Sequence, residues 1–457
     1  MSKIPDAFID FINSGRTPEP TLFLSTLREG SPTSIRINPS KNIENPQLEI
    51  VPWCAWGYYL SERPIFTLDP SFHAGKYYVQ EASSMSVYYV LDMILTKMNN
   101  PVILDISAAP GGKSTIISSM LKSRNDGILV SNDIISSRAY TLKYNLAKEG
   151  NGNTIVTNAH PKSFAKIPSI FDIIVVDAPC SGEGLFRKDP SAMQEWSPEN
   201  VQMCAARQKD IISDLIGLLK PSGYLVYSTC TYNASENMEN IHHFIEKYGL
   251  RSIPIQFDKD WHIFEDTENG NFGYQFYPHR TKGEGFFISL LQKPNGNDVQ
   301  IREHRTSTLL RPLSKRQIEE ISTWVQWNAD FESLGIDKVD NVHLLPNTCI
   351  DIAEKLKLGK VQIIDIGTTI GTFKKDIFIP HHHLALSKNL HTTVQKCELN
   401  KSQALQFLKK ENLVLDMNMT GWVCMLFEGL PIGWAKFLPN RINNYLPSEY
   451  AIKMDIK

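Results

Sequence analysis

Short apolar runs alternate with helical segments through the middle of the chain, and this alternation constrains the fold more than any other feature. The runs have the length and the β-branched composition of buried strands. We expect strands at Val102 to Asp105, Gly127 to Asn132, Thr154 to Thr157, Phe171 to Asp177, Tyr224 to Thr229 and Gly285 to Leu291. Strands that alternate with helices form βαβ crossovers. The pattern therefore predicts a mostly parallel, doubly wound α/β sheet whose ligands bind at the carboxyl ends of the strands.

The 457-residue chain is too long for one ordinary core, and its composition shifts predict three parts. Residues 1–78 mix a short helical start with the strand-like SIRINPS and several prolines, which indicates a small α+β extension. Residues 79–293 hold the alternating pattern. The polar, turn-rich KPNGNDVQIREHRTS then predicts a linker into residues 294–457, which we expect to be α+β with a compact β-rich end.

The amino-acid composition indicates a reducing compartment and does not decide whether the protein binds nucleic acid. A formal net charge of -2 gives no global sign of nucleic-acid binding, so contact with RNA requires a local basic surface. The seven cysteines are scattered, without a CxxC pair or a zinc-like spacing to histidine. No run of about 18 apolar residues predicts a membrane span, and the start MSKIPDAFIDFINSG lacks a signal-peptide core. We expect a cytoplasmic monomer without a metal site, in which single thiols can act as nucleophiles.

A loop of small residues follows the first predicted strand of the sheet. PVILDISAAPGGKSTIISSM runs from strand to tight turn to helix, which brings backbone groups close to a ligand at a helix N-terminus. One candidate ligand is a nucleotide phosphate. Ser107 to Ser114 reads SxxxxGKS, one substitution from the P-loop pattern, and FDIIVVDAP can supply a magnesium aspartate. The serine in place of the first glycine and the missing N–H of Pro110 weaken this alternative.

The second candidate ligand is S-adenosylmethionine (SAM). Its amino-acid end needs backbone groups, and its ribose hydroxyls need a carboxylate at the end of the next strand, as in dinucleotide-binding folds. Asp133 ends ILVSNDI at the position that this carboxylate requires. A small-residue turn can also serve only to pack a helix on a strand, but the agreement between the loop and Asp133 favours a cofactor site.

Two cysteines follow two later strands of the predicted sheet. Cys180 lies in DAPCSGEG and Cys230 in YSTCTYNASEN, so both thiols are expected at the sheet edge where the cofactor binds. A single buried cysteine is commonly inert, whereas a pair at matching positions favours chemistry. Carbon 5 of cytosine is a poor nucleophile, but a thiolate that adds to carbon 6 produces an enamine that can attack a methyl sulfonium. A second acid or base must then help to release the product, and Asp177 can hydrogen-bond N3 and the exocyclic amine of the base.

These motifs resemble those of the NOL/NOP/Sun family of RNA 5-methylcytosine methyltransferases. The resemblance covers most of the chain, and the order of segments is most similar to that of the bacterial RsmF-type enzymes, which modify small-subunit (16S) ribosomal RNA. It rests on SIRINP, YYVQEASSM, DISAAPGGKS, DAPCSGEGLFRKDP, STCTYNASEN and YPHRTKGEGFFIS. The late segment GLPIGWAKFLPNRINNYLP (429–447) resembles the PUA-like module that closes RsmF-type proteins.

The resemblance implies a fold, a reaction and a set of site residues. The implied fold is a Rossmann-like SAM-dependent methyltransferase domain between an N-terminal α+β RNA-binding extension and a C-terminal α+β region with a PUA-like end. The implied reaction is methylation of carbon 5 of a cytosine in structured rRNA, in which Cys230 attacks the base and Cys180 assists product release. The implied SAM residues are Ala108, Ala109, Pro110, Gly111, Gly112, Lys113, Ser114, Asp133, Arg138 and Asp177.

One position departs from the family pattern. Where the family has an aspartate near the adenine, this chain reads TNAHPKSF, so either Asn158 or His160 replaces that contact or the affinity for SAM is lower.

The C-terminal region offers three weaker signals. Trp434, Lys436 and Arg441 combine an aromatic ring with cations, which suits RNA, although burial explains a tryptophan equally well. The run His381 to His383 lacks a partner carboxylate and indicates a loop. A basic stripe, either RNA-facing or a solvated helix face, consists of Arg302, Arg305, Arg311, Lys315 and Arg316 against the single acid Glu303.

Two other functional classes stay open on the sequence. A P-loop ATPase would bind nucleotide with magnesium and would not bind SAM. A noncatalytic ribosome-assembly protein would bind RNA and would tolerate the loss of both cysteines, which the intact motif set disfavours.

Overall fold

The computed structural model describes residues 4–15, 17–41, 46–296, 309–330, 332–415 and 419–454. Ten strands form its central sheet: β4 (Val102–Asp105), β5 (Ile128–Asn132), β6 (Thr154–Asn158), β7 (Phe171–Asp177), β8 (Leu219–Thr229), β9 (Arg251–Ile253), β10 (Phe264–Glu268), β11 (Asn271–Phe276), β12 (Phe286–Gln292) and β15 (Gln362–Ile366). Their order is β10-β11-β12-β8-β7-β4-β5-β6-β15, with β9 beside β12. The strands from β8 to β6 are parallel, and antiparallel strands extend both edges. The predicted Rossmann-like α/β class is confirmed.

The predicted strands match the observed ones closely, and β8 shows the largest difference. It begins at Leu219, five residues before the expected start at Tyr224, because Leu219 pairs with Phe171 ahead of a bulge in β8. Ser222, between Pro221 and Gly223, has φ +62°, and residues 220–223 have no partner in β7, so the turn that the sequence suggests is present as this bulge.

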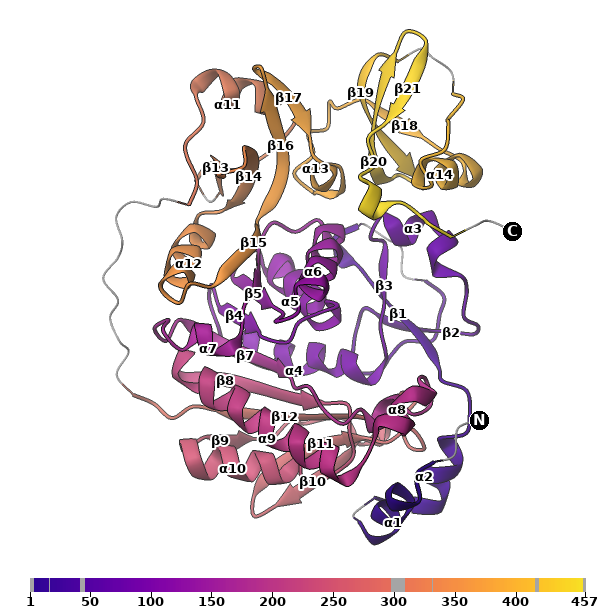
Figure 1. Ribbon diagram of the computed structural model, residues 1–457, viewed down its shortest axis with the longest axis vertical. Coiled ribbons are helices and arrows are strands. Elements are labelled where there is room, and N and C mark those ends of the chain that lie inside the picture. Colours follow the sequence, from indigo (N-terminus) through magenta and orange to yellow (C-terminus); the bar gives the residue numbers. More distant parts are fainter. Residues whose placement is uncertain are drawn as a thin grey trace.

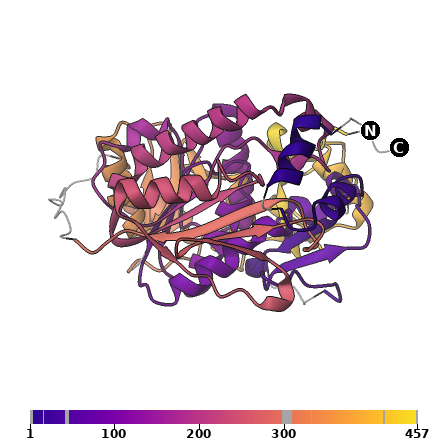
Figure 2. The same cartoon turned by 90° about the horizontal axis from the view of Figure 1, so that it is seen from below.

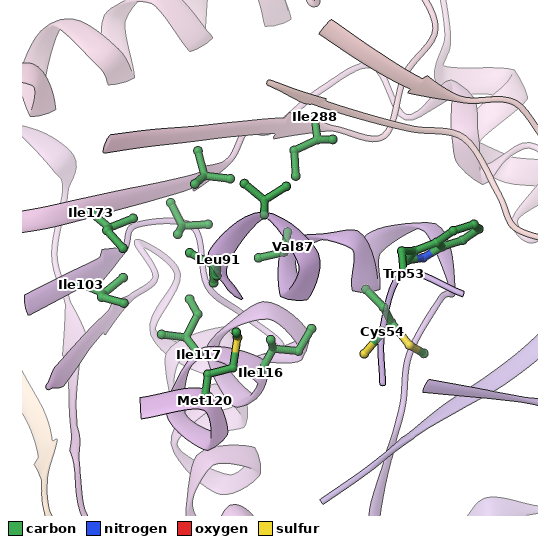
Figure 3. Close-up of a cluster of buried hydrophobic side chains, with 14 of the residues drawn as sticks. Trp53, Cys54, Val87, Leu91, Ile103, Ile116, Ile117, Met120, Ile173 and Ile288 are labelled. Carbon is green, nitrogen blue, oxygen red and sulfur yellow. The ribbon is translucent and has the colours of Figure 1, made fainter. Parts of the chain in front are cut away.

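Helices cover both faces of the sheet. They are α4 (Ser86–Leu95), α5 (Gly112–Arg124), α6 (Ser136–Glu149), α7 (Pro161–Phe164), α8 (Pro190–Glu195), α9 (Pro198–Leu215) and α10 (Met238–Tyr248), with 3-10 turns η3 (Ser83–Met85), η4 (Glu183–Leu185), η5 (Ile216–Leu218) and η6 (Lys259–Trp261). Figure 2 shows helices on both sides of the strands. Ile103 faces the apolar cluster of α4 and α5 in Figure 3, whereas its neighbour Leu104 faces the cluster of α9 and α10. This alternation buries both faces, as a parallel sheet requires.

Two helices of the N-terminal region pack against the segments that follow Cys180 and Cys230. The elements of this region are α1 (Asp6–Ser14), α2 (Pro20–Thr26), β1 (Thr33–Ile37), η1 (Pro39–Lys41), β2 (Gly57–Leu60), η2 (Phe66–Leu68), α3 (Pro70–His73) and β3 (Tyr77–Val79), and its sheet has the order β2-β1-β3. Phe8 of α1 contacts Phe186, and Phe23 of α2 contacts Tyr232, with ring centroids 5.0 and 4.8 Å apart. These two helices therefore buttress the segments that follow Cys180 and Cys230.

The C-terminal region forms two further lobes, coloured orange and yellow in Figure 1. They contain α11 (Lys315–Ile321), β13 (Glu332–Ile336), β14 (Asn341–Pro346), α12 (Asn347–Leu358), β16 (Thr368–Lys374), β17 (Ile377–Pro380), α13 (His382–Leu386), β18 (Lys396–Glu398), α14 (Lys401–Leu408), β19 (Gly421–Phe427), β20 (Leu430–Leu438), β21 (Arg441–Asn444) and η7 (Ser448–Tyr450). The first lobe is anchored to the central sheet, because β15 pairs with β6 and α12 packs into the same core as α9.

The structure decides between the alternatives left open in this region. Trp434 is 1% exposed and donates its indole N–H to the carbonyl of His381, so it is a core residue and not an RNA surface. Lys436 lies 5.4 Å from the ring of Trp422, and Arg441 is exposed. His383 is buried and hydrogen-bonded to Tyr450 at 2.6 Å.

Part of the expected basic stripe is neutralised. Arg302, Arg305 and Glu303 lie outside the described residues. Arg311 is paired with Asp340, and Arg316 with Asp376. Within the described ranges, no helix is both long and apolar enough to cross a membrane.

Candidate active site

The small-residue loop lies between the end of β4 and the start of α5, as predicted. Gly111 adopts φ +118°, a conformation that favours glycine, and this turn lets α5 begin at Gly112. Ser114 is fully buried behind the loop, where its hydroxyl donates to Asp105 at 2.6 Å and contacts Ser131 at 2.9 Å. Gly111 and Ser114 therefore shape the loop from behind and do not line either of the cavities beside it.

Two neighbouring cavities follow the carboxyl ends of the strands, with volumes of about 190 and 730 Å³. The smaller one is lined by Ala108, Ala109, Pro110, Gly112 and Lys113 of the loop. The larger one is lined by Asp133, Arg138, Cys180 and Cys230. Ser107, Ala109 and Asp177 line both cavities, so the expected residues are gathered around one continuous region.

Asp133 lies immediately after β5 and is only 3% exposed. Its carboxylate accepts the backbone N–H of Ile135 at 2.9 Å, and Arg138 lies 3.6 Å from its other oxygen. Arg138 also donates to the carbonyl of Ala109 at 2.7 Å. Arg138, one of the SAM residues that the resemblance implies, thus connects the cofactor loop to the Asp133 carboxylate.

The structure separates the two candidates at the β6 end. Asn158 donates its side-chain amide to the carbonyls of Asp133 and Ile134, at 2.7 and 3.1 Å, and so supports the turn after β5. His160 lines the larger cavity, and its ring accepts from the N–H of Lys162 at the start of α7. His160 is therefore the one of the two that faces the cavity.

The two catalytic candidates meet at the adjacent ends of β7 and β8. These parallel strands pair Asp177 with Ser228, which places the following loops side by side. The sulfur atoms of Cys180 and Cys230 lie 2.9 Å apart, and both cysteines are free thiols. The hydrogen bond to Cys230 and burial raise the pKa of the Cys180 thiol well above its ordinary value. Both causes favour the protonated form of Cys180 in the resting site.

Two buried glutamates lock the cysteine loops to each other. Glu183, from the Cys180 loop, accepts the backbone N–H of Tyr232 at 2.7 Å. Glu236, from the Cys230 loop, accepts the backbone N–H of Ser181 at 3.1 Å and the side chain of Gln208 at 2.7 Å. Because each motif supplies the acceptor for the other, the spacing of the thiols is held by charge-assisted hydrogen bonds in a dry environment.

Asp177 and Lys113 form an ion pair between the two cavities, with Nζ 2.7 Å from Oδ2. The hydroxyl of Ser228 donates to the other oxygen of Asp177 at 3.0 Å. This arrangement disfavours the P-loop alternative, because the lysine is directed at a carboxylate and the Ser114 hydroxyl is occupied by Asp105. Neither group is presented to a phosphate and its magnesium ion.

Several lining residues were not predicted from the sequence. Asp105, Tyr78 and Gln80 line the smaller cavity, and their signal was present in DISAAPGGKS and YYVQEASSM. Burial raises the pKa of Asp105 to about 7, and its Oδ1 atom has no hydrogen-bond partner among the described residues. The larger cavity is also lined by three residues of α9, which belong to no recognisable sequence motif: Arg207, Asp210 and Asp214.

The residues present fit SAM. The buried, unpartnered Asp105 oxygen suits a cationic amino group, and the exposed edge of the small-residue loop suits the rest of an amino-acid end. A buried carboxylate after β5 suits ribose hydroxyls. A Rossmann-like sheet with this cavity and two adjacent thiols defines a SAM-dependent methyltransferase of the RNA 5-methylcytosine class.

Comparison with known proteins agrees with this class. The family description "16S rRNA methyltransferase RsmB/F" matches residues 92–292, the N-terminal domain of 16S rRNA methyltransferase RsmF matches residues 4–82, and the RsmF PUA domain matches residues 394–452. Ribosomal RNA small subunit methyltransferase F of Vibrio parahaemolyticus is 30% identical over 478 residues, covering 98% of this chain and 97% of the relative. The protein of the same name from Aliivibrio fischeri is 29% identical over 469 residues, with the same coverage. The chain belongs to the RsmF-type 16S rRNA cytosine-C5 methyltransferases of the RsmB/F family, and it uses SAM.

Solved structures show the same fold over about two thirds of the chain. NSun6 from Pyrococcus horikoshii, solved with SFG, has a TM-score of 0.53 at 21% identity, covering 64% of this chain and 99% of that one. A methyltransferase homologue from the same organism has a TM-score of 0.54 at 25% identity, covering 63% and 95%. The predictions of family, reaction and cofactor are confirmed, and rRNA is the substrate that the protein binds.

Proposed function

We propose that the protein methylates carbon 5 of a cytosine in 16S rRNA through a covalent bond between Cys230 and carbon 6 of the base. The observation that carries this proposal is the pair of thiols 2.9 Å apart, in the cavity that also contains Asp133 and the edge of the cofactor loop. Such a pair suits a reaction that needs one thiolate to attack and a second group to complete the release.

The cofactor residues have separate tasks in this proposal. The backbone from Ala108 to Gly112 and the free Asp105 oxygen hold the amino-acid end of SAM, with Ser114 bracing the loop. Asp133 holds the ribose, with Arg138 as its tie to the loop, and His160 borders the adenine. Bound SAM supplies an electrophilic methyl group. The protein's contribution is to hold that group against carbon 5.

The base is activated from one side. The Cys230 thiolate adds to carbon 6, which converts carbon 5 into a nucleophilic enamine carbon. Asp177 accepts a hydrogen bond from the exocyclic amine, and its ion pair with Lys113 and its bond from Ser228 keep it in place. Transfer of the methyl group leaves carbon 5 with a proton that must be removed.

The change in the Cys230 sulfur prepares Cys180 for this step. While Cys230 is free, its hydrogen bond raises the pKa of Cys180. Once Cys230 is a neutral thioether, the largest cause is lost and the pKa of Cys180 falls, while burial and Glu236 still raise it. Cys180 gives up its proton to solvent through the cavity that it lines. The Cys180 thiolate then takes the proton from carbon 5, and the electrons of that C–H bond expel Cys230 as a thiolate.

We further propose how the rest of the chain serves this site. The functional division falls near residues 78 and 293, and the outer regions position an unpaired or flipped cytosine through phosphate contacts. The protein acts as a monomer in the cytoplasm. A reducing compartment suits the site, because two thiols at 2.9 Å would join under oxidising conditions.

Nucleoside mass spectrometry tests the proposal. Purified protein is incubated with methyl-labelled SAM and either deproteinised 16S rRNA, small ribosomal subunits or tRNA. The expected result is label in 5-methylcytidine from small-subunit RNA. Label in tRNA alone would keep the chemistry and reject the substrate, and label in no RNA would reject the function.

A change at Asp133 tests the cofactor assignment separately. Asp133→Asn keeps an acceptor for the N–H of Ile135 but removes the charge offered to the ribose. We expect the Kd for SAM, measured by calorimetry, to rise about tenfold to a hundredfold. Arg138→Gln is the matched control, because it leaves the carboxylate in place and should have a smaller effect. An unchanged Kd for Asp133→Asn would contradict the assignment.

A further inference from the structure

One wall of the larger cavity is made by α9, whose Arg207, Asp210, Ile211 and Asp214 line it. The same helix is attached to the Cys180 loop, because Gln208 donates to the carbonyl of Pro179 at 3.1 Å and to Glu236 at 2.7 Å. Arg207 is therefore presented to the cavity from the helical turn that is attached to the cysteine loops. The later part of α9 packs against α7, at the His160 side.

The charge of Arg207 is not used within the protein. Of the other cations that line this cavity, Arg138 is paired with Asp133, and Lys162 lies on α7 at the His160 side, away from the cysteine loops. Arg207 is exposed and has no ion pair or side-chain hydrogen bond among the residues that the structure describes. Asp210, three residues further along the helix, is not within ion-pair distance of it.

The environment of Cys204 supports this placement near the nucleophile. Burial and Glu236 raise the pKa of the Cys204 thiol, Arg207 lowers it, and Cys230 raises it. Cys204 and Arg207 are three residues apart on α9, so the turn that carries the arginine also lies near the loop of Cys230.

We propose that Arg207 binds a backbone phosphate next to the target cytosine and so positions that nucleotide against Cys230. A guanidinium forms bidentate hydrogen bonds with phosphate, and a polynucleotide that brings one base to this cavity must bring its own phosphates to the rim. The inference rests on the proposed function. It adds a positioning residue from a helix that carries no recognisable RNA motif.

The test compares Arg207→Gln with the wild-type enzyme on deproteinised 16S rRNA. The expected result is a KM for RNA about tenfold to a hundredfold higher with kcat nearly unchanged. The slope of log binding constant against log salt should become shallower by about 0.7 to 0.9, the signature of one lost phosphate contact. Arg207→Lys should restore the slope but only part of the affinity.

Lys209→Gln is the matched control, because it removes a cation from the same helix on the side facing α10, where Lys209 lowers the pKa of His243. It should leave KM and the salt slope unchanged. A wild-type salt slope for Arg207→Gln, or a loss of SAM affinity in place of RNA affinity, would overturn the proposal. The binding slope is measured without turnover. If the function is wrong, the wild-type enzyme makes no 5-methylcytidine. If only this inference is wrong, the wild-type enzyme makes 5-methylcytidine and Arg207→Gln keeps the wild-type salt slope.

Discussion

Replacing Cys230 by alanine is expected to abolish methyl transfer, lowering the turnover rate by at least about four orders of magnitude. Without the Cys230 thiolate, no sulfur adds to carbon 6 from the end of β8, so carbon 5 of the base is not activated. The measurement is the rate of label transfer from SAM to 16S rRNA. The affinity for SAM, measured by calorimetry, should stay close to that of the wild type, because Cys230 contributes no charge or backbone contact to the cofactor loop.

Cys204→Ala provides the control for loss of a thiol. Cys204 lies on α9, is 6% exposed and does not line either cavity. This variant should keep near-normal turnover. Methyl transfer at the wild-type rate by Cys230→Ala would reject the covalent mechanism.

Replacing Cys180 by alanine is expected to leave attack intact and to block release. The protein should then accumulate as a covalent complex with RNA that survives denaturation, and turnover should fall by about a hundredfold to ten-thousandfold. The reason is that the proton on carbon 5 loses its acceptor, so Cys230 cannot be expelled. Radiolabelled RNA on a denaturing gel measures the complex, which should approach one RNA per protein.

The double variant Cys180→Ala with Cys230→Ala separates a covalent bond from tight binding. It should show no retained RNA, because the attacking sulfur is absent. If Cys180→Ala turned over normally and gave no retained band, Cys180 would have no part in release.

The sequence predicted the sheet and the chemistry of its edge. Apolar runs such as Phe171 to Asp177 are short, β-branched and bounded by turn residues, so local pattern was sufficient to place the strand. Cys230 and Asp133 were identified because each directly follows such a run, and Cys180 because it lies three residues after one; parallel strands end at the same edge of a sheet. The family comparison confirmed the reaction that these positions suggested.

Other features depended on contacts between distant segments. Ser114 was expected at the cofactor, but its hydroxyl turns inward to Asp105, a choice set by the depth at which α5 packs. Trp434 was a candidate RNA residue, and only its hydrogen bond to the carbonyl of His381, 53 residues away, identifies it as core. The strand β15 joins the central sheet beside β6 across about two hundred residues of chain, which no local periodicity can reveal.

By itself, the sequence determined which residue types stand at the ends of the strands, and hence a SAM-dependent methyltransferase with two thiols in one cleft. The physical reason is that strand alternation and small-residue turns are local properties of the chain. Tertiary structure alone decided that the sulfurs meet at 2.9 Å, that Glu183 and Glu236 lock the two loops to each other, and that α9 presents Arg207 to the cavity. Those outcomes depend on the rotation and depth of packed elements, which are set by burial and hydrogen bonding among residues far apart in the chain.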